Sequence, residues 1–266
     1  MQSRREFLQV ALATAALVGT RGAPALSQAL AGTIRQDDIL QFRSTGQVTL
    51  LHYADCHAQL RPVYFREPSI NLGVGKVREL PPHITDRDFL ARYGIDAGSY
   101  RAYAMSSADF ETLARTYGRV GGLDRMATLV KAIRAERGVN RTLLIDGGDT
   151  LHGSYTAMQS QGADMVRDLE ALGVDTITGH WEFTLGDKRV REVFGDKEGR
   201  GTAKVDFLAS NVVDTAFEEP VFKSWRIYEK GGIRIGVVGQ AFPYSPIANP
   251  RWMMSDWSFG IREDAV

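Results

Sequence analysis

Cysteine is almost absent from this sequence of 266 residues, which contains only Cys56. One cysteine excludes an internal disulfide, so the fold must be stabilised by an apolar core and by any metal that the chain binds. Charge of one sign is also missing, because 32 Lys and Arg balance 32 Asp and Glu. The basic residues are spread along the chain, whereas a nucleic-acid-binding surface needs them clustered, so we expect no nucleic-acid partner.

Long apolar runs are missing as well. The run near the N-terminus, residues 10–18, is shorter than the ~20 residues that a membrane-spanning helix needs. It follows Arg4 and Arg5 and precedes small residues at 23–29. This order is typical of a twin-arginine export signal over residues 1–29, although a Sec signal or a fortuitous basic N-terminus would share it. We therefore expect a periplasmic protein without stable membrane insertion after the signal is cleaved.

The remaining composition, 44% hydrophobic and 24% charged overall, is that of a globular domain. Apolar runs rich in β-branched residues alternate with amphipathic helical patterns, which predicts a mixed α/β sheet covered by helices on both faces. Residues 68–119 fit this alternation poorly, and we interpret them as an insertion with short helices such as 107–116 in a domain spanning 40–266. The expected strands are 48–53, 142–145, 174–177, 205–209 and 233–238, and the expected helices are 123–137, 163–172 and 187–193.

Polar side chains follow every expected strand at its carboxyl end, where open α/β sheets bind their ligands. Five such strand ends would bring carboxylate, imidazole and amide groups to one edge of the sheet. In chain order they are Asp55-Cys56-His57, Asp146-Gly147-Gly148-Asp149, Gly179-His180-Trp181-Glu182, Ser210-Asn211 and Gly239-Gln240.

The first two of these segments predict a metal site. Asp55 and His57 offer an oxygen and a nitrogen from the same side of an extended segment, which suits Mn, Fe or Zn. Cys56 is expected to point the other way as a small buried residue. Asp149 follows two glycines that permit a sharp turn, so its carboxylate can lie between two ions roughly 3.5–4 Å apart. Helix capping ahead of Thr150 is the alternative role, and we favour it for Asp146.

Other candidates near these segments carry weaker signals. Gly153 and Ser154 could present donors to an anion or could form a helix N-cap. Among the five histidines, His52 is expected to pack within its strand, whereas His83 and His152 are expected to be surface or supporting residues.

Asp-x-His, Gly-Asp and Gly-His-x-Glu, in this order, resemble the calcineurin-like metallophosphoesterase superfamily on its 5′-nucleotidase branch. That branch has Gly-Asn-His-Glu as its third block. His180 therefore stands where the family has its Asn ligand, and Trp181 stands where it has its catalytic His. With this change, and with residues 61–68 and 71–75, the chain resembles the SoxB-type thiosulfohydrolases of the Sox pathway along its whole length.

The resemblance implies an αββα-type sandwich, with mixed sheets flanked by helices, that binds two Mn²⁺ ions or, in their place, Zn or Fe. It implies that Asp55 and His57 hold the first ion, that Asp149 bridges, and that His180 takes the Asn position at the second ion. A shifted alternative makes His180 the counterpart of the catalytic His. Trp181 and Glu182 align with the His and Glu of the family's third block, and this alignment favours the ligand role for His180. No catalytic residue is securely assigned.

The activity implied by the resemblance is hydrolysis of the S–S bond of a cysteine S-thiosulfonate on the carrier SoxY, part of the SoxYZ complex. Sulfate is released in this step of thiosulfate oxidation. Arg61, Tyr64 and Arg66 could line a channel for the peptide arm of the carrier and grip the sulfonate. The alternative for them is a surface arginine with packed aromatics. Asn211 is a further candidate for substrate binding.

The later histidine motifs of the family, including Gly-His-x-His, do not occur before Val266, and its C-terminal domain is also missing from this sequence. We therefore interpret the chain as the N-terminal part of a longer protein and expect it to be inactive alone. A periplasmic 5′-nucleotidase or other phosphoesterase with the same metal core is the alternative function. A non-catalytic binding protein that has lost complete metal ligation is a second alternative.

Overall fold

The computed structural model describes residues 46–64 and 73–261 of the chain. The chain divides into two compact units, which we call the helical unit and the sheet unit. The helical unit includes Arg61–Met126, and the sheet unit consists of Arg43–Leu60 and Ala127–Val266. The predicted export signal at 1–29 lies outside the described residues.

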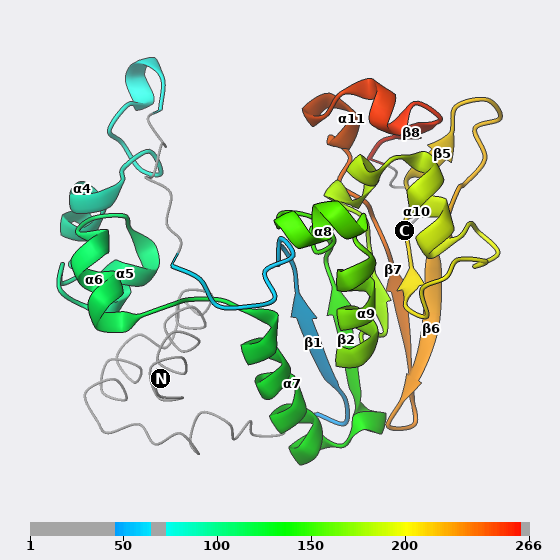
Figure 1. The fold of residues 1–266 in the computed structure, drawn as a ribbon, viewed down its shortest axis with the longest axis horizontal. Helices are drawn as coiled ribbons and strands as arrows, with labels where there is room; N and C mark the ends of the chain where they lie inside the picture. Colours follow the sequence, from blue (N-terminus) through cyan, green and yellow to red (C-terminus); the bar gives the residue numbers. More distant parts are fainter. Residues whose placement is uncertain (1–45, 65–72, 262–266) are drawn as a thin grey trace. The chain divides into compact units, whose positions relative to one another are not determined.

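A four-stranded parallel sheet forms the sheet unit's larger sheet (Figure 1). Each pair of neighbouring strands runs parallel, so their carboxyl ends share one edge. The first four expected strands are thereby confirmed, although the third and fourth are shorter than predicted. In spatial order they are β1 (Thr49–Tyr53), β2 (Thr142–Asp146), β3 (Thr176–Ile177) and β4 (Asp206–Phe207).

The fifth expected strand is present, but it does not continue the parallel sheet. β7 (Ile233–Val238) pairs antiparallel with β6 (Trp225–Lys230) through a turn at Gly231 and Gly232 (Figure 1). These glycines have φ of +57° and +78°, as the two-residue turns of tight hairpins require. The expectation that all five strands belong to one sheet is therefore wrong, because β7 pairs with β6 in a separate two-stranded sheet.

The main helices of the sheet unit agree with the sequence pattern. α7 (Leu123–Arg137) and α9 (Ala163–Leu172) have the expected bounds, and α10 (Asp187–Phe194) extends one residue further than expected. None of the helices in the described residues is long and apolar enough to cross a membrane. The N-cap alternative for Ser154 is confirmed, because α8 (Tyr155–Ser160) begins directly after it. The other short helices, which were not predicted, are α11 (Ser245–Ala248), η2 (Val139–Arg141), η3 (Trp181–Leu185) and η4 (Arg251–Met254).

Aromatic side chains form much of the core in the second half of the sheet unit. The Phe183 ring is fully buried and lies edge-on to Phe207 and to Trp257, with centroid distances of 6.0 and 5.7 Å. Trp257 belongs to β8 (Trp257–Phe259), which pairs antiparallel with β5 (Val212–Asp214). This packing holds η3, and with it the segment after β3, against the sheet unit's core.

The helical unit packs three short helices around its own core. α4 (Asp86–Arg92), α5 (Tyr100–Met105) and α6 (Phe110–Tyr117) follow the 3-10 helix η1 (Gly75–Val77). α6 covers most of the helix expected at 107–116. The core residues of this unit are Leu90, Ile95, Ala102, Tyr103, Leu113 and Ala114.

Candidate metal centre

Two loops at the carboxyl edge of the parallel sheet are joined through their backbones. The loop after β1 carries Asp55 and His57, and the loop after β2 carries Asp149. Asp55 N donates to Gly148 O at 2.9 Å, and His57 N donates to Asp149 O at 2.8 Å. Because these bonds continue the pairing of β1 with β2 beyond the strands, the two loops are held side by side.

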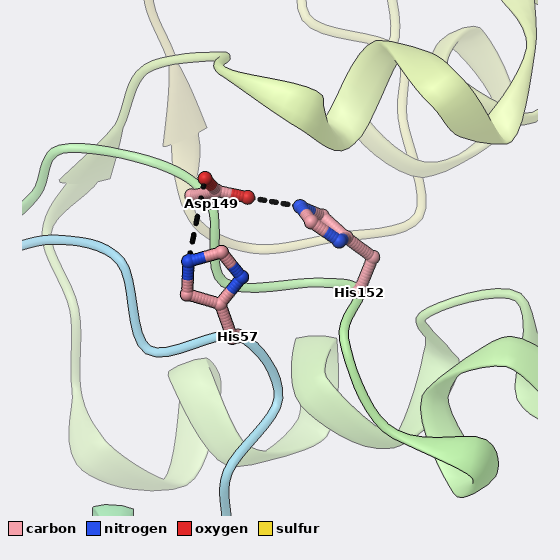
Figure 2. A group of neighbouring side chains, drawn as sticks. All are labelled: His57, Asp149 and His152. Carbon is pink, nitrogen blue, oxygen red and sulfur yellow. Dashed lines mark hydrogen bonds and ion pairs between the residues drawn. The ribbon is translucent and has the colours of Figure 1, made fainter. Parts of the chain in front are cut away.

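The Asp149 carboxylate lies at the centre of the candidate site, although the residue is only 3% exposed. Its Oδ2 lies 2.6 Å from His180 Nδ1 and 3.6 Å from His57 Nε2. Its Oδ1 faces His152 Nε2, and Figure 2 shows the imidazoles of His57 and His152 both directed at the carboxylate. Three imidazole groups therefore converge on one buried carboxylate.

Two groups of three side chains could each hold a metal ion. One group is His57, Asp149 and His152, and the other is Asp55, Asp149 and His180, with ligand atoms within 4.8 Å of one another in each group. Asp149 belongs to both, as a carboxylate that bridges two ions must. Carboxylate oxygen and imidazole nitrogen suit Mn, Fe or Zn, so these donors fit the ions that the sequence pattern predicts.

The four predicted ligands thus come together, but Asp55 and His57 fall into different groups. The Asp-x-His spacing places both side chains on one side only if the segment is extended. The expectation of an extended segment is wrong, because Asp55 and His57 have left-handed φ of +57° and +48°. Non-glycine residues adopt this backbone at a cost, and such residues cluster at functional sites.

Glu182 is completely buried, and its carboxylate accepts four backbone hydrogen bonds. Oε1 accepts from Thr150 N at 2.7 Å and Leu151 N at 3.2 Å. Oε2 accepts from Asp149 N at 3.1 Å and His180 N at 2.8 Å. Charge-assisted hydrogen bonds are about twice as strong as neutral ones. Glu182 therefore fixes the Asp149 loop against the His180 segment, a role that sequence reasoning missed.

Asp146 supports the same loop from the end of β2. Its Oδ1 accepts from Gly148 N at 2.9 Å and from Thr150 Oγ1 at 3.0 Å. The prediction that Asp146 caps a helix ahead of Thr150 is wrong, because the next helix, α8, begins only at Tyr155. Its N-cap is Ser154, whose Oγ accepts a hydrogen bond from Ala157 N at 3.2 Å. Burial raises the pKa of Asp146 to about 7.

Close approach of the loops requires glycine at two positions. A Cβ on Gly148 would lie 2.7 Å from Thr178 O, and a Cβ on Gly153 would lie 2.5 Å from His57 O. Both distances are shorter than a van der Waals contact, so any side chain there would push the loops apart. Turning freedom at Gly148 is predictable from the sequence, whereas this close packing is not.

Cys56 lies between the two predicted ligands of the first loop and is only partly exposed. Burial, with a contribution from the nearby Asp146 charge, raises the pKa of its thiol to about 12. In the metal-free chain the thiol is therefore a weaker nucleophile than an ordinary cysteine. This agrees with the expectation of a small packed residue.

His152 is the candidate ligand that sequence reasoning missed. Besides facing Asp149, its ring stacks on Trp181, with centroids 5.8 Å apart and an interplanar angle of 20°. A usable signal was its position three residues after Asp149, on the same glycine-flanked loop. His52, by contrast, is exposed rather than packed and belongs to neither group of candidate ligands.

Three of the residues predicted to bind substrate follow the first metal loop. Arg61 and Tyr64 are exposed and belong to the helical unit. Within that unit the guanidinium carbon of Arg119 lies 5.3 Å from the centroid of the Tyr64 ring. Arg66 lies outside the described residues.

A pocket of about 400 Å³ lies beside the second group of candidate ligands. Asn211, which is only 1% exposed, supports this pocket through the backbone of Ala241. Its Nδ2 donates to Ala241 O at 2.8 Å, and its Oδ1 accepts from Ala241 N at 2.8 Å. The segment after β7 therefore still reaches the site, although β7 is outside the parallel sheet. The pocket is lined by Asp55, Gly147, Gly179, His180, Gln240, Ala241, Phe242 and Pro243.

No family model matches the chain. The sulfate thiohydrolase SoxB of Thermus thermophilus, solved in complex with glycerol, is 34% identical to it, with a TM-score of 0.69. The alignment covers 85% of this chain and 41% of SoxB. A 5′-nucleotidase of Vibrio cholerae serotype O1 is 28% identical over 141 residues, which are 52% of this chain and 24% of the nucleotidase.

The chain is thus similar to members of the SoxB and 5′-nucleotidase branch of the metallophosphoesterase superfamily. A 5′-nucleotidase precursor of Thermus thermophilus has the same fold, with 19% identity, a TM-score of 0.50, and coverage of 82% of this chain and 32% of the precursor. The chain thus spans less than half the length of each of these members of the branch.

Proposed function

We propose that the full-length protein is a dinuclear-metal hydrolase that is exported by the twin-arginine route and acts in the periplasm. Its substrate is the cysteine S-thiosulfonate on the carrier SoxY, within SoxYZ, and its products are sulfate and the persulfide of the carrier.

The observation that carries this proposal is the 34% identity to SoxB over 85% of the chain. The similarity to the Vibrio cholerae 5′-nucleotidase is weaker and covers 52% of the chain. The segment Gly179-His180-Trp181-Glu182 favours the same choice, because it departs from the nucleotidase pattern in the way that the SoxB-type sequence does.

The residues around Asp149 are suited to hold two divalent ions, which when bound would polarise the sulfonate oxygens and activate a water molecule. Asp55, His57 and His180 supply the other predicted donors, with Mn²⁺ as the proposed metal and Zn or Fe as substitutes. Glu182 keeps the loops fixed, so the donor atoms need little rearrangement when substrate binds.

The leaving group explains why Trp181 is tolerated where related phosphoesterases have a histidine. Hydrolysis adds the oxygen of water to the sulfonate sulfur and breaks its bond to the neighbouring sulfur, so sulfate and a persulfide anion are formed. A persulfide is a weaker base than an alkoxide and leaves without a proton donor. Replacing Trp181 by His is expected to raise phosphate release from nucleotides without abolishing sulfate release.

The test is sulfate release from thiosulfonated SoxYZ by the Mn-loaded full-length protein, measured by ion chromatography, with phosphate release from AMP measured in parallel. We expect sulfate in the first assay and little phosphate in the second. Asp149→Asn is expected to abolish sulfate release, whereas His52→Gln, a histidine of the same unit outside both candidate ligand groups, is expected to retain it.

Two results would overturn the proposal in favour of the alternatives. Phosphate from AMP without sulfate from SoxYZ would identify a nucleotidase of the same branch. A full-length protein that binds no metal and turns over neither substrate would identify a non-catalytic binding protein.

A further inference from the structure

His152 lies among the predicted metal ligands of the sheet unit but was not predicted to be one of them. It lies on the loop between β2 and α8, three residues after Asp149. Gly153 follows it with φ of +110°, and a Cβ there would meet His57 O at 2.5 Å. This close approach places the His152 segment directly against the His57 loop.

The donor atoms of His57, Asp149 and His152 face one another. All three lie within 4.8 Å of one another. The two imidazole rings are nearly perpendicular, at 85°, with centroids 5.4 Å apart, and both are directed at the Asp149 carboxylate (Figure 2). Donor atoms at this spacing, two imidazole nitrogens and one carboxylate oxygen, are a group that could hold one metal ion.

His180 and His152 approach different oxygens of the Asp149 carboxylate. Oδ2 lies 2.6 Å from His180 Nδ1, and Oδ1 faces His152 Nε2. His180 is a predicted metal ligand on its side of the carboxylate, and His152 holds the corresponding place on the other side. Stacking on Trp181 restricts the His152 ring and keeps Nε2 turned towards Asp149.

Burial favours a cation at this place. The Asp149 side chain is 4% exposed and the His152 side chain is 20% exposed. A buried carboxylate is costly unless it is paired with positive charge or coordinates a metal. Two neutral imidazoles and one carboxylate are a donor set that a divalent transition metal accepts.

We propose that His152 is a metal ligand, and that it binds the same ion as His57 and Asp149. The second ion is then held by Asp55, Asp149 and His180. The inference rests on the proposed dinuclear centre but not on the proposed Sox substrate. Its competitor is a purely supporting role, in which His152 only donates a hydrogen bond to Asp149.

His152→Gln separates the two roles. The amide nitrogen of glutamine can occupy about the position of Nε2 and can donate a hydrogen bond to Asp149. An ion that glutamine binds instead through its amide oxygen loses the imidazole nitrogen, so the histidine ¹⁴N coupling separates the two roles. His152 also lines a cavity of about 660 Å³ on its α8 side, so the longer side chain has room. His57→Gln is the variant of a predicted ligand, and His52→Gln is the matched control.

The test uses the full-length protein loaded with Mn²⁺. Metal content and affinity are measured by elemental analysis and by titration of free Mn²⁺ with electron paramagnetic resonance. Coordinated histidine nitrogens are counted from their ¹⁴N couplings by pulsed electron paramagnetic resonance. We expect His152→Gln and His57→Gln each to remove one histidine coupling and to weaken one ion at least about tenfold, whereas His52→Gln leaves both unchanged.

The outcomes separate the inference from the function on which it rests. Weakened binding with an unchanged number of histidine couplings would reduce His152 to a hydrogen-bond donor and overturn the assignment, as would a His152→Gln variant identical to the unsubstituted protein. A protein without bound metal would overturn both the centre and the inference. If His152→Gln fails to fold, the smaller His152→Asn is measured in the same way, and loss of one histidine coupling relative to the unsubstituted protein is again expected.

Discussion

The helical unit and the sheet unit treat their buried polar groups differently. Among the described residues that are both polar and buried, only Ser106 belongs to the helical unit, and its hydroxyl donates to Ala102 O at 2.9 Å. The buried Tyr103 hydroxyl of the same unit donates to Gly118 O. These groups are neutral and bond to nearby carbonyls, so their role is confined to stabilising the helices.

The sheet unit buries three carboxylates instead. Asp146, Asp149 and Glu182 are at most 3% exposed, and all lie just beyond or at the end of β2 and β3. Burial of a carboxylate costs free energy unless hydrogen bonds or a cation compensate it. Glu182 is compensated by backbone N–H groups, whereas Asp149 is surrounded by imidazoles. The contrast indicates that buried charge, not burial of polar groups in general, distinguishes the functional part of this molecule.

Removing the buried charge of Glu182 is the strongest test of this contrast. Glu182→Gln replaces one oxygen by an amide group that faces two N–H donors, so we expect the free energy of unfolding to fall by about 4 kcal/mol and metal affinity to fall with it. Tyr103→Phe, the counterpart in the helical unit, is expected to cost about 1 kcal/mol and leave metal affinity unchanged. Urea unfolding and Mn²⁺ titration measure both. Equal effects of the two substitutions would remove the contrast.

A second substitution tests whether the loops of the sheet unit depend on close backbone approach. Gly148→Ala would bring a Cβ within 2.7 Å of Thr178 O at φ of +92°, so we expect a loss of about 3 kcal/mol and weaker metal binding. Gly138→Ala has a nearly equal φ of +89° but meets nothing within 4 Å. Gly138→Ala therefore measures only the free energy of unfolding that is lost by placing alanine at a positive φ, which we expect to be about 1 kcal/mol. Thermal unfolding that shows no difference between the two variants would contradict the close-approach explanation.

The pH dependence of stability sharpens the role of Asp146. Burial raises its pKa from 3.8 to about 7. Because the folded-state pKa is the higher one, the protonated carboxyl stabilises the fold at low pH, and this contribution is lost as the pH rises from about 4 to about 7. Asp146→Asn should keep both hydrogen bonds of Oδ1 without ionising.

In metal-free protein we therefore expect the free energy of unfolding of Asp146→Asn to exceed that of the unsubstituted protein by about 4 kcal/mol at pH 8 and to approach it at pH 4. Urea unfolding across this range measures the difference. A difference that is constant with pH would show that burial does not shift the titration of Asp146.

The smallest expected effects come from a feature that the two units share. Ser99 and Ser154 are N-caps of α5 and α8, and each side chain accepts a backbone hydrogen bond at 3.2 Å. Ser99→Ala and Ser154→Ala should each cost about 1 kcal/mol. Differential scanning calorimetry would show whether each substitution lowers the same transition or separate ones. If Ser154→Ala lowered Mn²⁺ affinity as much as Glu182→Gln does, α8 itself would hold the metal ligands in position.

Long periodic segments were the part of the fold that could be predicted. α7 and α9 have the expected bounds because their apolar spacing marks one buried face over several turns. β1 and β2 follow from short β-branched runs. The helices of four to six residues, α5, α8 and α11, are too short to show a repeating pattern. Their ends are set by caps and by tertiary contacts.

The candidate site was predicted in its residue types but not in its arrangement. Asp55, His57, Asp149 and His180 follow strand ends, and parallel strands place such ends at one edge of a sheet. Left-handed backbone at Asp55 and His57, however, divides them between two groups of donors. A sequence pattern that assumes an extended segment has no means of anticipating this turn.

Motif order along the chain was enough to predict the family resemblance and the ligand candidates, and local pattern was enough to predict the strand ends that carry them. Only the tertiary structure decided that Glu182 joins two loops and that His152 faces Asp149. Both depend on contacts between segments that the chain brings together by folding, and the free energy of a buried carboxylate is set by the groups around it rather than by its neighbours in sequence.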